Sequence, residues 1–406
     1  MQIGARYKAL GELMEQIFAD KQPADAVINA YFRERRYIGS GDRRFISEKI
    51  WDILRHRLRL GFEAGGEDIR KMLLLYTAED NQAEIFAGGQ YGLLPLTDAE
   101  KLWLQNRGEE PYPPYVEAEC PEWLFAKIGD MELLKSLNTT ASADFRVNSG
   151  TRDAALRQLE AEGLYLSKTP YSPIGIRAEG RINLNNCMAY QDGVIEVQDE
   201  ASQLVSLLCD VSFEHKTIDY CCGAGGKSLA IAALLHGKGK IAAHDIDPAR
   251  LEQLYPRMRR LGISNIVPLK TAETGSGYQR FIVDAPCSGS GTWRRSPDAK
   301  FRLTTQRLRE LCRIQAEILE TAYPKVAVGG RLIYITCSIL PDENENNIQS
   351  FCQKHPDMQL LDIAEIWQRK IGCAYPCANR YMLHLNPLVA GTDGFFAAIL
   401  QKNAAI

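Results

Sequence analysis

Two cysteines in the second half of the chain stand where apolar segments end. Cys287 lies in "VDAPCSGSGTWRR" (283–295), three residues after Asp284, and Cys337 lies in "YITCSILPDENENN" (334–347). The carboxyl ends of parallel strands open onto one crevice, so both thiols and the carboxylate are expected there. Thiolates are nucleophiles, so such a crevice suits covalent chemistry. With eleven cysteines in the chain, chance placement is the alternative.

The stretch "DYCCGAGGKS" (219–228) follows one expected strand and precedes the apolar helix "SLAIAALLHG". It has too few residues for a Walker loop and lacks the G-x-G-x-x-G spacing of dinucleotide-binding proteins. Asp245 ends the next expected strand, where an acid accepts the hydroxyls of a ribose. A glycine turn, this acid and no phosphate cradle together favour S-adenosylmethionine over a generic turn. Cys221 and Cys222 are then small buried residues beside the cofactor.

The composition is that of an ordinary globular protein. The 406 residues are 45% hydrophobic and 24% charged, with a formal net charge of −3. No apolar run is long enough to cross a bilayer, and the first twenty residues mix charged and apolar residues at helical spacing, so a cytoplasmic protein is expected. The cysteines are expected to be free thiols, and without a C-x-x-C pair they predict no metal site.

Positive charge is concentrated in two stretches. Residues 31–60 carry nine Lys/Arg against four acids, and residues 291–313 carry seven against two. One such stretch is ordinarily a solvated helix face. Two of them, with aromatic residues such as Tyr37 and Trp293 interleaved, favour a polyanion partner.

The order of expected elements divides the chain into three parts. Helical spacing continues to about residue 110, and four prolines in "PYPPYVEAECPEW" (111–123) predict an extended linker. From about residue 143 the pattern is strand–helix–strand, with Ser149 or Thr151 as the helix cap. We therefore expect a helical, RNA-binding domain at 1–135, a small α/β module that positions RNA at 136–195 and a catalytic domain at 196–406.

The catalytic domain alternates strands and helices. Expected strands occupy 217–222, 239–246, 265–271, 280–286 and 330–338. This alternation predicts the α/β class, with a doubly wound, Rossmann-like parallel sheet. A last strand at 395–402 follows a short connection and is expected to run antiparallel.

These motifs together resemble those of the RsmB-type (Nol/Nop/Sun) RNA cytosine-5 methyltransferase family. Its cofactor loop reads C-A-A-P-G-G-K, its fourth strand ends D-A-P-C-S-G-x-G, and its fifth ends T-C-S with P-x-E-N-E following. The chain has "CCGAGGK", "DAPCSGSG" and "TCSILPDENE", with "VQDEAS" (197–202) and "DGFFAA" (393–398). The resemblance spans about residues 143–406, and the N-terminal helices faintly resemble a NusB-like RNA-binding domain.

The resemblance implies a reaction and four catalytic residues. A thiolate adds to C6 of cytosine so that C5 can attack the methyl group of S-adenosylmethionine. Cys337 would be the nucleophile, Cys287 would act in product release, and Asp284 would bond the N3/N4 edge of the base. The residues alone do not show which of the two cysteines is the nucleophile. In the analogous DNA enzymes the nucleophilic cysteine follows a proline, which would favour Cys287. Lys227 would bond Asp284 or the base, or else cap loop carbonyls.

The expected cofactor-binding residues follow from the loop and the strand ends. Ala224 replaces the usual proline of the loop, which reduces rigidity and removes no donor. Near Thr271 the family has an acid at the adenine, whereas this chain reads "PLKTAET", so Glu273 or backbone atoms could take that role. The full set is Cys221, Cys222, Gly223, Ala224, Gly225, Gly226, Lys227, Asp245, Thr271 and Asp284.

The target base must be exposed to reach a crevice this deep, so single-stranded RNA or a flipped base is expected. The two parts before the catalytic domain would hold the surrounding RNA. Arg294 and Arg295 are expected at phosphates near the target. Further candidates, for which surface solubility is the competing explanation, are Arg33, Arg35, Arg36, Arg43 and Arg44.

The expected partner is RNA, with rRNA favoured over tRNA, and the protein is expected to be a monomer without metal or membrane. One rival is a methyltransferase of this fold that acts on a small molecule or protein, which leaves the two cysteines and the basic stretches unexplained. The other is a catalytically idle RNA-binding or assembly factor. Retention of Cys337, Cys287 and Asp284 favours the active enzyme.

Overall fold

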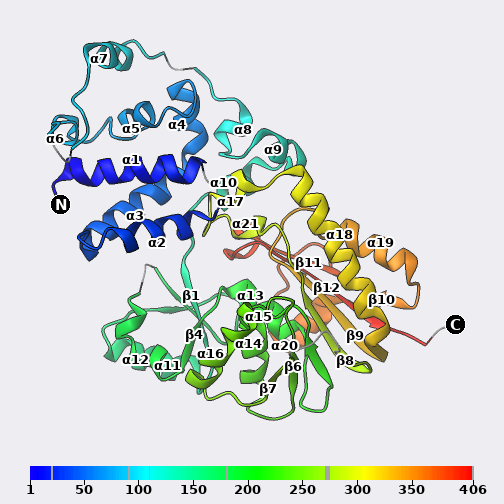
Figure 1. Cartoon of the computed structure of the whole chain (residues 1–406). Helices are drawn as coiled ribbons and strands as arrows, with labels where there is room; N and C mark the ends of the chain where they lie inside the picture. Colours follow the sequence, from blue (N-terminus) through cyan, green and yellow to red (C-terminus); the bar gives the residue numbers. More distant parts are fainter. Residues whose placement is uncertain (20–21, 90–91, 109, 180–181, 270–274, 405–406) are drawn as a thin grey trace. The chain divides into compact units, whose positions relative to one another are not determined.

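A computed structural model describes residues 1–19, 22–89, 92–108, 110–179, 182–269 and 275–404 (Figure 1). The chain forms two units. The first comprises Met1–Thr139 and Trp293–Leu303, and the second comprises Thr140–Thr292 and Thr304–Ile406. The chain therefore leaves the second unit after Thr292 and returns to it at Thr304.

The first unit is helical in the residues that are described. Helix α1 contacts α2, α3, α5 and α6, and its residues Leu10, Leu13 and Met14 are fully buried in the core of this unit. The helical spacing of the sequence is thus confirmed. The helices are α1 (Ile3–Ala19), α2 (Ala24–Glu34), α3 (Ser40–Arg55), α4 (Arg57–Ala64), α5 (Ile69–Tyr76), α6 (Gln82–Ile85), α7 (Asp98–Gln105), α8 (Pro114–Glu117), α9 (Glu122–Ile128), α10 (Met131–Leu137) and α17 (Ala299–Arg302).

The proline-rich segment 111–123 is not the extended linker that its composition suggested. It contains α8 and the start of α9. Pro114 occupies the first turn of α8, and Pro121 immediately precedes α9. Proline is tolerated at these positions because the first N–H groups of a helix have no partner within the helix, and its fixed φ suits the first turn.

The segment Trp293–Leu303, which the sequence analysis placed in the catalytic domain, belongs to the first unit. The Asp298 carboxylate accepts a hydrogen bond from Ala24 N (3.0 Å) at the start of α2, which has no side-chain cap from its own N-cap residue. Arg55, the last residue of α3, donates a hydrogen bond through Nη2 to the carbonyl of Arg294 (2.5 Å). The segment therefore supplies polar partners at the ends of two helices.

The second unit begins with the small α/β module. Its four-stranded sheet has the order β2-β3-β1-β4, and every described pair is antiparallel. Thr151 caps α11 by accepting a hydrogen bond from Ala154 N, as one of the two expected caps. The elements are β1 (Ala143–Val147), α11 (Arg152–Ala161), β2 (Ser167–Lys168), β3 (Gly175–Ala178), α12 (Met188–Gln191) and β4 (Ile195–Val197).

The main sheet has the order β10-β12-β9-β8-β5-β6-β7, with β11 paired to β12. The pairs among β5 to β9 are parallel, whereas β12 runs antiparallel to β9, as predicted. The strands are β5 (Thr217–Asp219), β6 (Ile241–Ala243), β7 (Ile266–Pro268), β8 (Tyr278–Asp284), β9 (Val326–Thr336), β10 (Met358–Leu360), β11 (Met382–Leu385) and β12 (Phe395–Lys402).

Helices cover both faces of this sheet (Figure 1). Ile333 and Ile335 of β9 pack with residues of α13, α14 and α20, whereas Leu332 and Tyr334 pack with residues of α18 and α19. Alternate residues of one strand thus enter two cores, which is the doubly wound arrangement. The helices are α13 (Glu200–Leu208), α14 (Gly226–Leu234), α15 (Pro248–Glu252), α16 (Leu254–Arg260), α18 (Thr305–Ala322), α19 (Glu345–Lys354), α20 (Ile363–Lys370) and α21 (Pro387–Ala390).

The register of the sheet brings the predicted chemical residues to one edge. Asp219 at the end of β5 pairs with Ala243 of β6 and with Ile282 of β8, and Asp284 of β8 pairs with Ile335 of β9.

Among the described residues no helix is both long and apolar enough to cross a membrane.

Candidate active site

The turn from β5 to α14 forms the predicted cofactor loop. Gly225 is the N-cap residue of α14 and has a φ of 81°, and a Cβ atom there would lie 2.3 Å from Leu254 Cδ1. Only glycine tolerates both constraints. The neighbouring carbonyl of Ala224 accepts a hydrogen bond from Arg257 Nη1 (2.6 Å), which holds the loop where the family has proline. A Cβ atom on Gly226 would meet nothing within 4 Å, so the loop borders open space.

Asp245 lies at the end of β6, next to the loop. Its carboxylate is 7% exposed and accepts hydrogen bonds from Gly223 N (2.7 Å) and Asp247 N (2.9 Å). Each carboxylate oxygen can accept more than one hydrogen bond, so these contacts orient the group and leave acceptor sites for a ligand. The next side chain, Ile246, is 94% exposed. The sequence analysis missed it, although an isoleucine directly after the ribose-binding acid was a visible signal.

These residues fit S-adenosylmethionine. Asp245 would bond the ribose, Gly226 would leave room along the loop, and Ile246 would offer an apolar surface to the adenine ring. The expected contacts of Thr271, and of its alternative Glu273, lie outside the described residues. Cys222 is buried and Cys221 partly buried, and burial raises the pKa of both thiols, as suits small packing residues.

Lys227 extends from the first turn of α14 to Asp284, with 2.7 Å between Nζ and Oδ2. Asp284 was one of its expected partners. Burial lowers the pKa of a lysine, but the Asp284 carboxylate outweighs that effect and the pKa of Lys227 lies above its ordinary value. Lys227 is therefore a charged partner for Asp284, whose side chain stays 30% exposed.

The structure brings the two cysteines together. Cys287 Sγ and Cys337 Sγ are 3.3 Å apart, and both residues are partly buried. The contact with Cys337, and then burial, raise the pKa of Cys287 well above its ordinary value. Either sulfur can be the donor in this contact. Among the described residues no group of three or more His, Cys, Asp or Glu side chains could hold a metal ion.

A buried acid that the sequence analysis did not single out lies between the two cysteine loops. Glu343 is fully buried, and its carboxylate accepts hydrogen bonds from Ser288 and Ser338, which directly follow the two cysteines. Its position in the quoted "PDENENN" motif was the available signal. Three acids in that motif made it impossible to tell which one turns inward.

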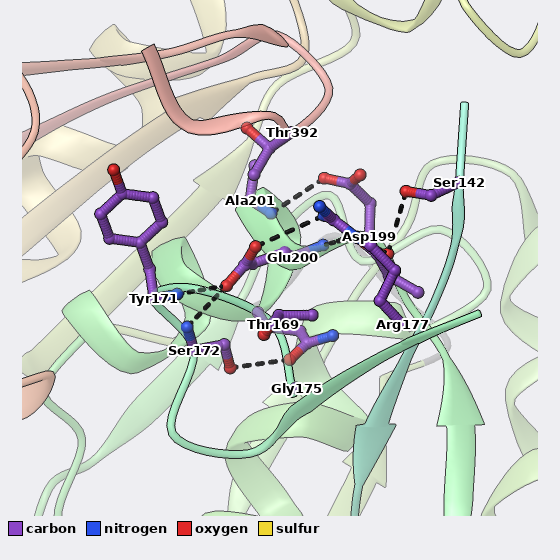
Figure 2. Close-up of polar contacts among 12 residues, drawn as sticks. Ser142, Thr169, Tyr171, Ser172, Gly175, Arg177, Asp199, Glu200, Ala201 and Thr392 are labelled. Atoms are coloured by element: carbon purple, nitrogen blue, oxygen red, sulfur yellow. Dashed lines mark hydrogen bonds and ion pairs between the residues drawn. The ribbon is translucent and has the colours of Figure 1, made fainter. Parts of the chain in front are cut away.

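The small α/β module is tied to the catalytic sheet by buried polar contacts (Figure 2). Glu200 at the start of α13 accepts hydrogen bonds from the backbone N–H groups of Tyr171 and Ser172, at 2.7 Å each. Arg177 of β3 forms a bidentate pair with Asp144 of β1 and also reaches Glu200. Hydrogen bonds to charged groups of this kind are strong, so the module is a fixed part of the second unit.

A second set of contacts runs from the module to the cofactor loop. Arg146 of β1 is fully buried and donates to Gln198 Oε1 (2.6 Å) and to the carbonyl of Gly226 (3.4 Å). Gln198 also donates to that carbonyl (3.2 Å). Since Gly226 begins the helix that carries Lys227, the module supports the cofactor loop directly.

The expected RNA-binding arginines differ in accessibility. Arg33, Arg36 and Arg44 are exposed. Arg35 and Arg43 are half-buried: Arg35 lies over the Tyr31 ring, and Arg43 donates to the Ile38 carbonyl.

The two arginines after the Cys287 loop also differ. Arg295 is exposed, whereas Arg294 is 9% exposed. That burial counts against the phosphate contact expected of Arg294, because a phosphate needs an accessible guanidinium group.

The doubly wound sheet, the glycine loop and the acid at the end of β6 define an S-adenosylmethionine-dependent methyltransferase. The family model described as "16S rRNA methyltransferase RsmB/F" matches residues 207–401. The chain is 30% identical to ribosomal RNA small subunit methyltransferase B of Pseudomonas syringae pv. tomato, over 76% of this chain and 66% of the relative. It is 31% identical to the probable enzyme of that name from Bacillus subtilis, over 70% and 67%. The chain belongs to the RsmB/F methyltransferase family.

Solved structures agree with this fold. The crystal structure of PH0851 superposes with a TM-score of 0.75 at 24% identity and covers 98% of each chain. NSun6 from Pyrococcus horikoshii with SFG has a TM-score of 0.61 at 19% identity, covering 72% of this chain and 100% of its own. At these identities the likeness shows the fold.

Proposed function

We propose that the chain methylates C5 of a cytosine in RNA through a covalent adduct between a cysteine and C6 of the base. The observation that carries this proposal is the sulfur–sulfur distance of 3.3 Å between Cys287 and Cys337, beside the Lys227–Asp284 pair. A single nucleophile would need one thiol. Two thiols in contact suit a reaction in which one bonds the base and the other acts on the adduct.

Cys337 is the nucleophile in this proposal, as the resemblance to the family implies, and Cys287 lies in contact with it. The Cys337 thiolate adds to C6, and Asp284, held by Lys227, bonds the N3/N4 edge of the base, where the Lys227 ammonium offsets the negative charge that develops on the ring. C5 becomes nucleophilic and takes up the methyl group. S-Adenosylmethionine, held by the loop and Asp245, supplies that group as an electrophile.

Cys287 acts in the second half of the reaction. Once C5 carries the methyl group, its proton must leave and the C6–sulfur bond must break, which restores the aromatic ring and frees Cys337. Cys287 lies next to the sulfur that departs. In this proposal its thiol protonates that sulfur as the C6–sulfur bond breaks, and the thiolate left on Cys287 takes up the C5 proton. We assign Cys287 to this release step.

Small-subunit ribosomal RNA is the favoured substrate over tRNA. The relatives from Pseudomonas syringae and Bacillus subtilis are named for that RNA. The exposed arginines Arg33, Arg36, Arg44 and Arg295 are candidates for phosphate contacts outside the crevice.

Covalent trapping tests the proposal. Purified Cys287→Ala and Cys337→Ala proteins are mixed with cellular RNA and S-adenosylmethionine and run on a denaturing gel. We expect a slowly migrating protein–RNA adduct from Cys287→Ala alone, with 5-methylcytosine in the trapped RNA. The reverse pattern would exchange the two roles. Absence of an adduct from both, together with no methylation by the unmodified protein, would favour an idle RNA-binding factor.

The substrate is identified separately. Mapping 5-methylcytosine in total RNA from cells with and without the gene should show one or a few cytosines of small-subunit rRNA that depend on it. A dependent cytosine in tRNA instead would assign the enzyme to tRNA.

A further inference from the structure

We propose that Glu343 is a positioning residue that clamps the Cys287 loop to the Cys337 loop and thereby sets the distance between the two sulfur atoms. The role of this clamp in catalysis rests on the proposed function. The effect of the clamp on the geometry of the two loops is independent of that function.

The clamp binds the Cys287 loop at the residue after the cysteine. Glu343 Oε1 accepts a hydrogen bond from Ser288 N at 2.8 Å, and Oε2 accepts one from Ser288 Oγ at 2.5 Å. Both oxygens of one carboxylate thus hold one serine through its backbone and its side chain. This fixes the backbone next to Cys287 rather than only a side chain.

The same carboxylate binds the Cys337 loop at the equivalent position. Glu343 Oε2 accepts a hydrogen bond from Ser338 Oγ at 2.5 Å. The two serines therefore share one oxygen atom, and their own hydroxyl oxygens are 3.3 Å apart. One buried acceptor thus joins the two loops, beside direct hydrogen bonds from Gly291 N to the Cys337 carbonyl (2.9 Å) and from Ile339 N to Ser290 Oγ (2.9 Å).

Further contacts keep the carboxylate from turning. Gln315 of α18 donates through Nε2 to Glu343 Oε1 (2.9 Å) and to the carbonyl of Pro286 (2.9 Å), directly before Cys287. Asn347 donates to Gln315 Oε1 (2.9 Å), which fixes the orientation of that amide. Glu343 and Gln315 are both fully buried. A buried, fully bonded network of this kind has one low-energy geometry.

The charge of Glu343 also acts on the cysteine pair. It is among the groups that raise the pKa of Cys287, after the Cys337 contact and burial. Cys337 in turn contributes to the raised pKa of Lys227, after the effects of burial and of Asp284.

Disulfide formation measures the sulfur–sulfur distance without RNA. A diazene oxidant such as diamide takes two electrons and two protons from Cys287 and Cys337, becomes a hydrazine and leaves one S–S bond. We expect rapid formation in the unmodified protein. Glu343→Gln should slow it by about tenfold or more, because an intramolecular reaction depends on how often the sulfurs meet. Its rate of methylation should fall by about a hundredfold, while S-adenosylmethionine affinity stays unchanged.

Glu200→Gln is the matched control. Glu200 is equally buried and accepts several hydrogen bonds, but it joins the small module to α13. The Glu200→Gln variant should have a lower melting temperature than the unmodified protein, and its disulfide should form at the same rate. Equal slowing by both variants, or a Glu343→Gln rate like that of the unmodified protein, would overturn the clamp.

A milder variant keeps the test open if Glu343→Gln does not fold. Ser338→Ala removes the bond from the Cys337 loop to Glu343, together with the contact of Ser338 Oγ with Ser290 Oγ (2.9 Å), and leaves the bonds from Ser288 to Glu343. It should slow disulfide formation by about threefold or more, because the sulfurs then meet less often, and an unchanged rate would also overturn the proposal. A slow disulfide in a variant that still methylates RNA would refute the catalytic role of the clamp. Failure of the unmodified protein to methylate any RNA would refute the proposed function alone.

Discussion

Lys227 Nζ lies 2.7 Å from Asp284 Oδ2, so one ion pair joins the helix after the cofactor loop to the end of β8. Lys227 is 8% exposed, and Asp284 is 30% exposed. The cofactor loop and the carboxylate proposed to bind the base are thus held in one geometry. Loss of either partner affects the other.

Replacement of Lys227 by Met should lower the free energy of unfolding by about 1–3 kcal/mol, because it leaves the partly exposed Asp284 carboxylate without its partner. Asp284→Asn should also destabilise, and the double variant should lose less than the sum of the two single losses. Urea unfolding of the four proteins measures this coupling. Strictly additive losses would show that the pair contributes nothing to stability. Methylation should be lost in all three variants.

Asp219 makes the stability depend on pH. It is fully buried at the end of β5, and burial raises its pKa to about 7. The unfolded chain ionises this group near pH 4 while the folded protein keeps its proton. Stability therefore falls as pH rises through this window, by about 2 kcal/mol between pH 5 and pH 7.

The Asp219→Asn variant mimics the protonated acid and lacks this loss. Its free energy of unfolding relative to the unmodified protein should rise from pH 5 to pH 7 and then level off. Urea unfolding at four pH values measures the difference. A difference that is constant across this range would show that the fold does not raise the pKa of Asp219 above about 5.

Ile246 tests the cofactor surface. Ile246→Ala should weaken S-adenosylmethionine binding by about tenfold, the equivalent of losing one or two buried methylene groups. Calorimetry measures the dissociation constant. Val328→Ala is the control, because Val328 is 66% exposed near the amino end of β9, at the other edge of the sheet. Equal effects from both variants would contradict the adenine surface.

Arg146 tests the support of the cofactor loop by the small module. Arg146→Lys removes the planar group that reaches both Gln198 and the Gly226 carbonyl. S-Adenosylmethionine affinity should fall by about threefold to tenfold, together with a loss of stability of about 2–3 kcal/mol. Arg177→Lys, on β3 of the same sheet, should lose stability without this loss of affinity. Affinity that is unchanged in Arg146→Lys would argue against the support.

Exposed arginines of the first unit are tested by the salt dependence of RNA binding. The double variant Arg33→Gln, Arg36→Gln should reduce the slope of log K against log salt by about 1.4 for a single-stranded RNA oligonucleotide, if each arginine neutralises one phosphate. Filter binding between 50 and 300 mM salt measures the slope. Arg369 and Arg380 are the control pair, since both are exposed and already paired with carboxylates. A slope equally reduced by the control pair would point to net charge alone.

The strand ends of the catalytic domain were predictable because parallel strands put their carboxyl ends at one edge. Cys287, Cys337 and Asp284 needed no further information to be placed together. The partner of Lys227 remained open, because a lysine at a helix start can reach carbonyls or an acid. Only the packed structure selects Asp284.

Glu343 and Arg294 could not be predicted for the same physical reason. Each lies in a polar stretch whose neighbours are also charged, and no hydrophobic period shows which side chain turns inward. Glu343 turns inward because the serines after both cysteines bond it. Arg294 is buried because its segment belongs to a unit whose other residues lie more than 150 positions earlier. Pattern reasoning is local, so it does not reach contacts of that range.

The passage of the chain through the first unit has a consequence for its synthesis. Helices α1 to α10 leave the ribosome first, but the Asp298 carboxylate that bonds the start of α2 belongs to the segment Trp293–Leu303. At about 5–20 residues per second, the ribosome adds that segment roughly ten to thirty seconds after Thr139. The first unit thus waits for its final residues while the small module and about half of the catalytic domain are translated, so its maturation is timed by that elongation.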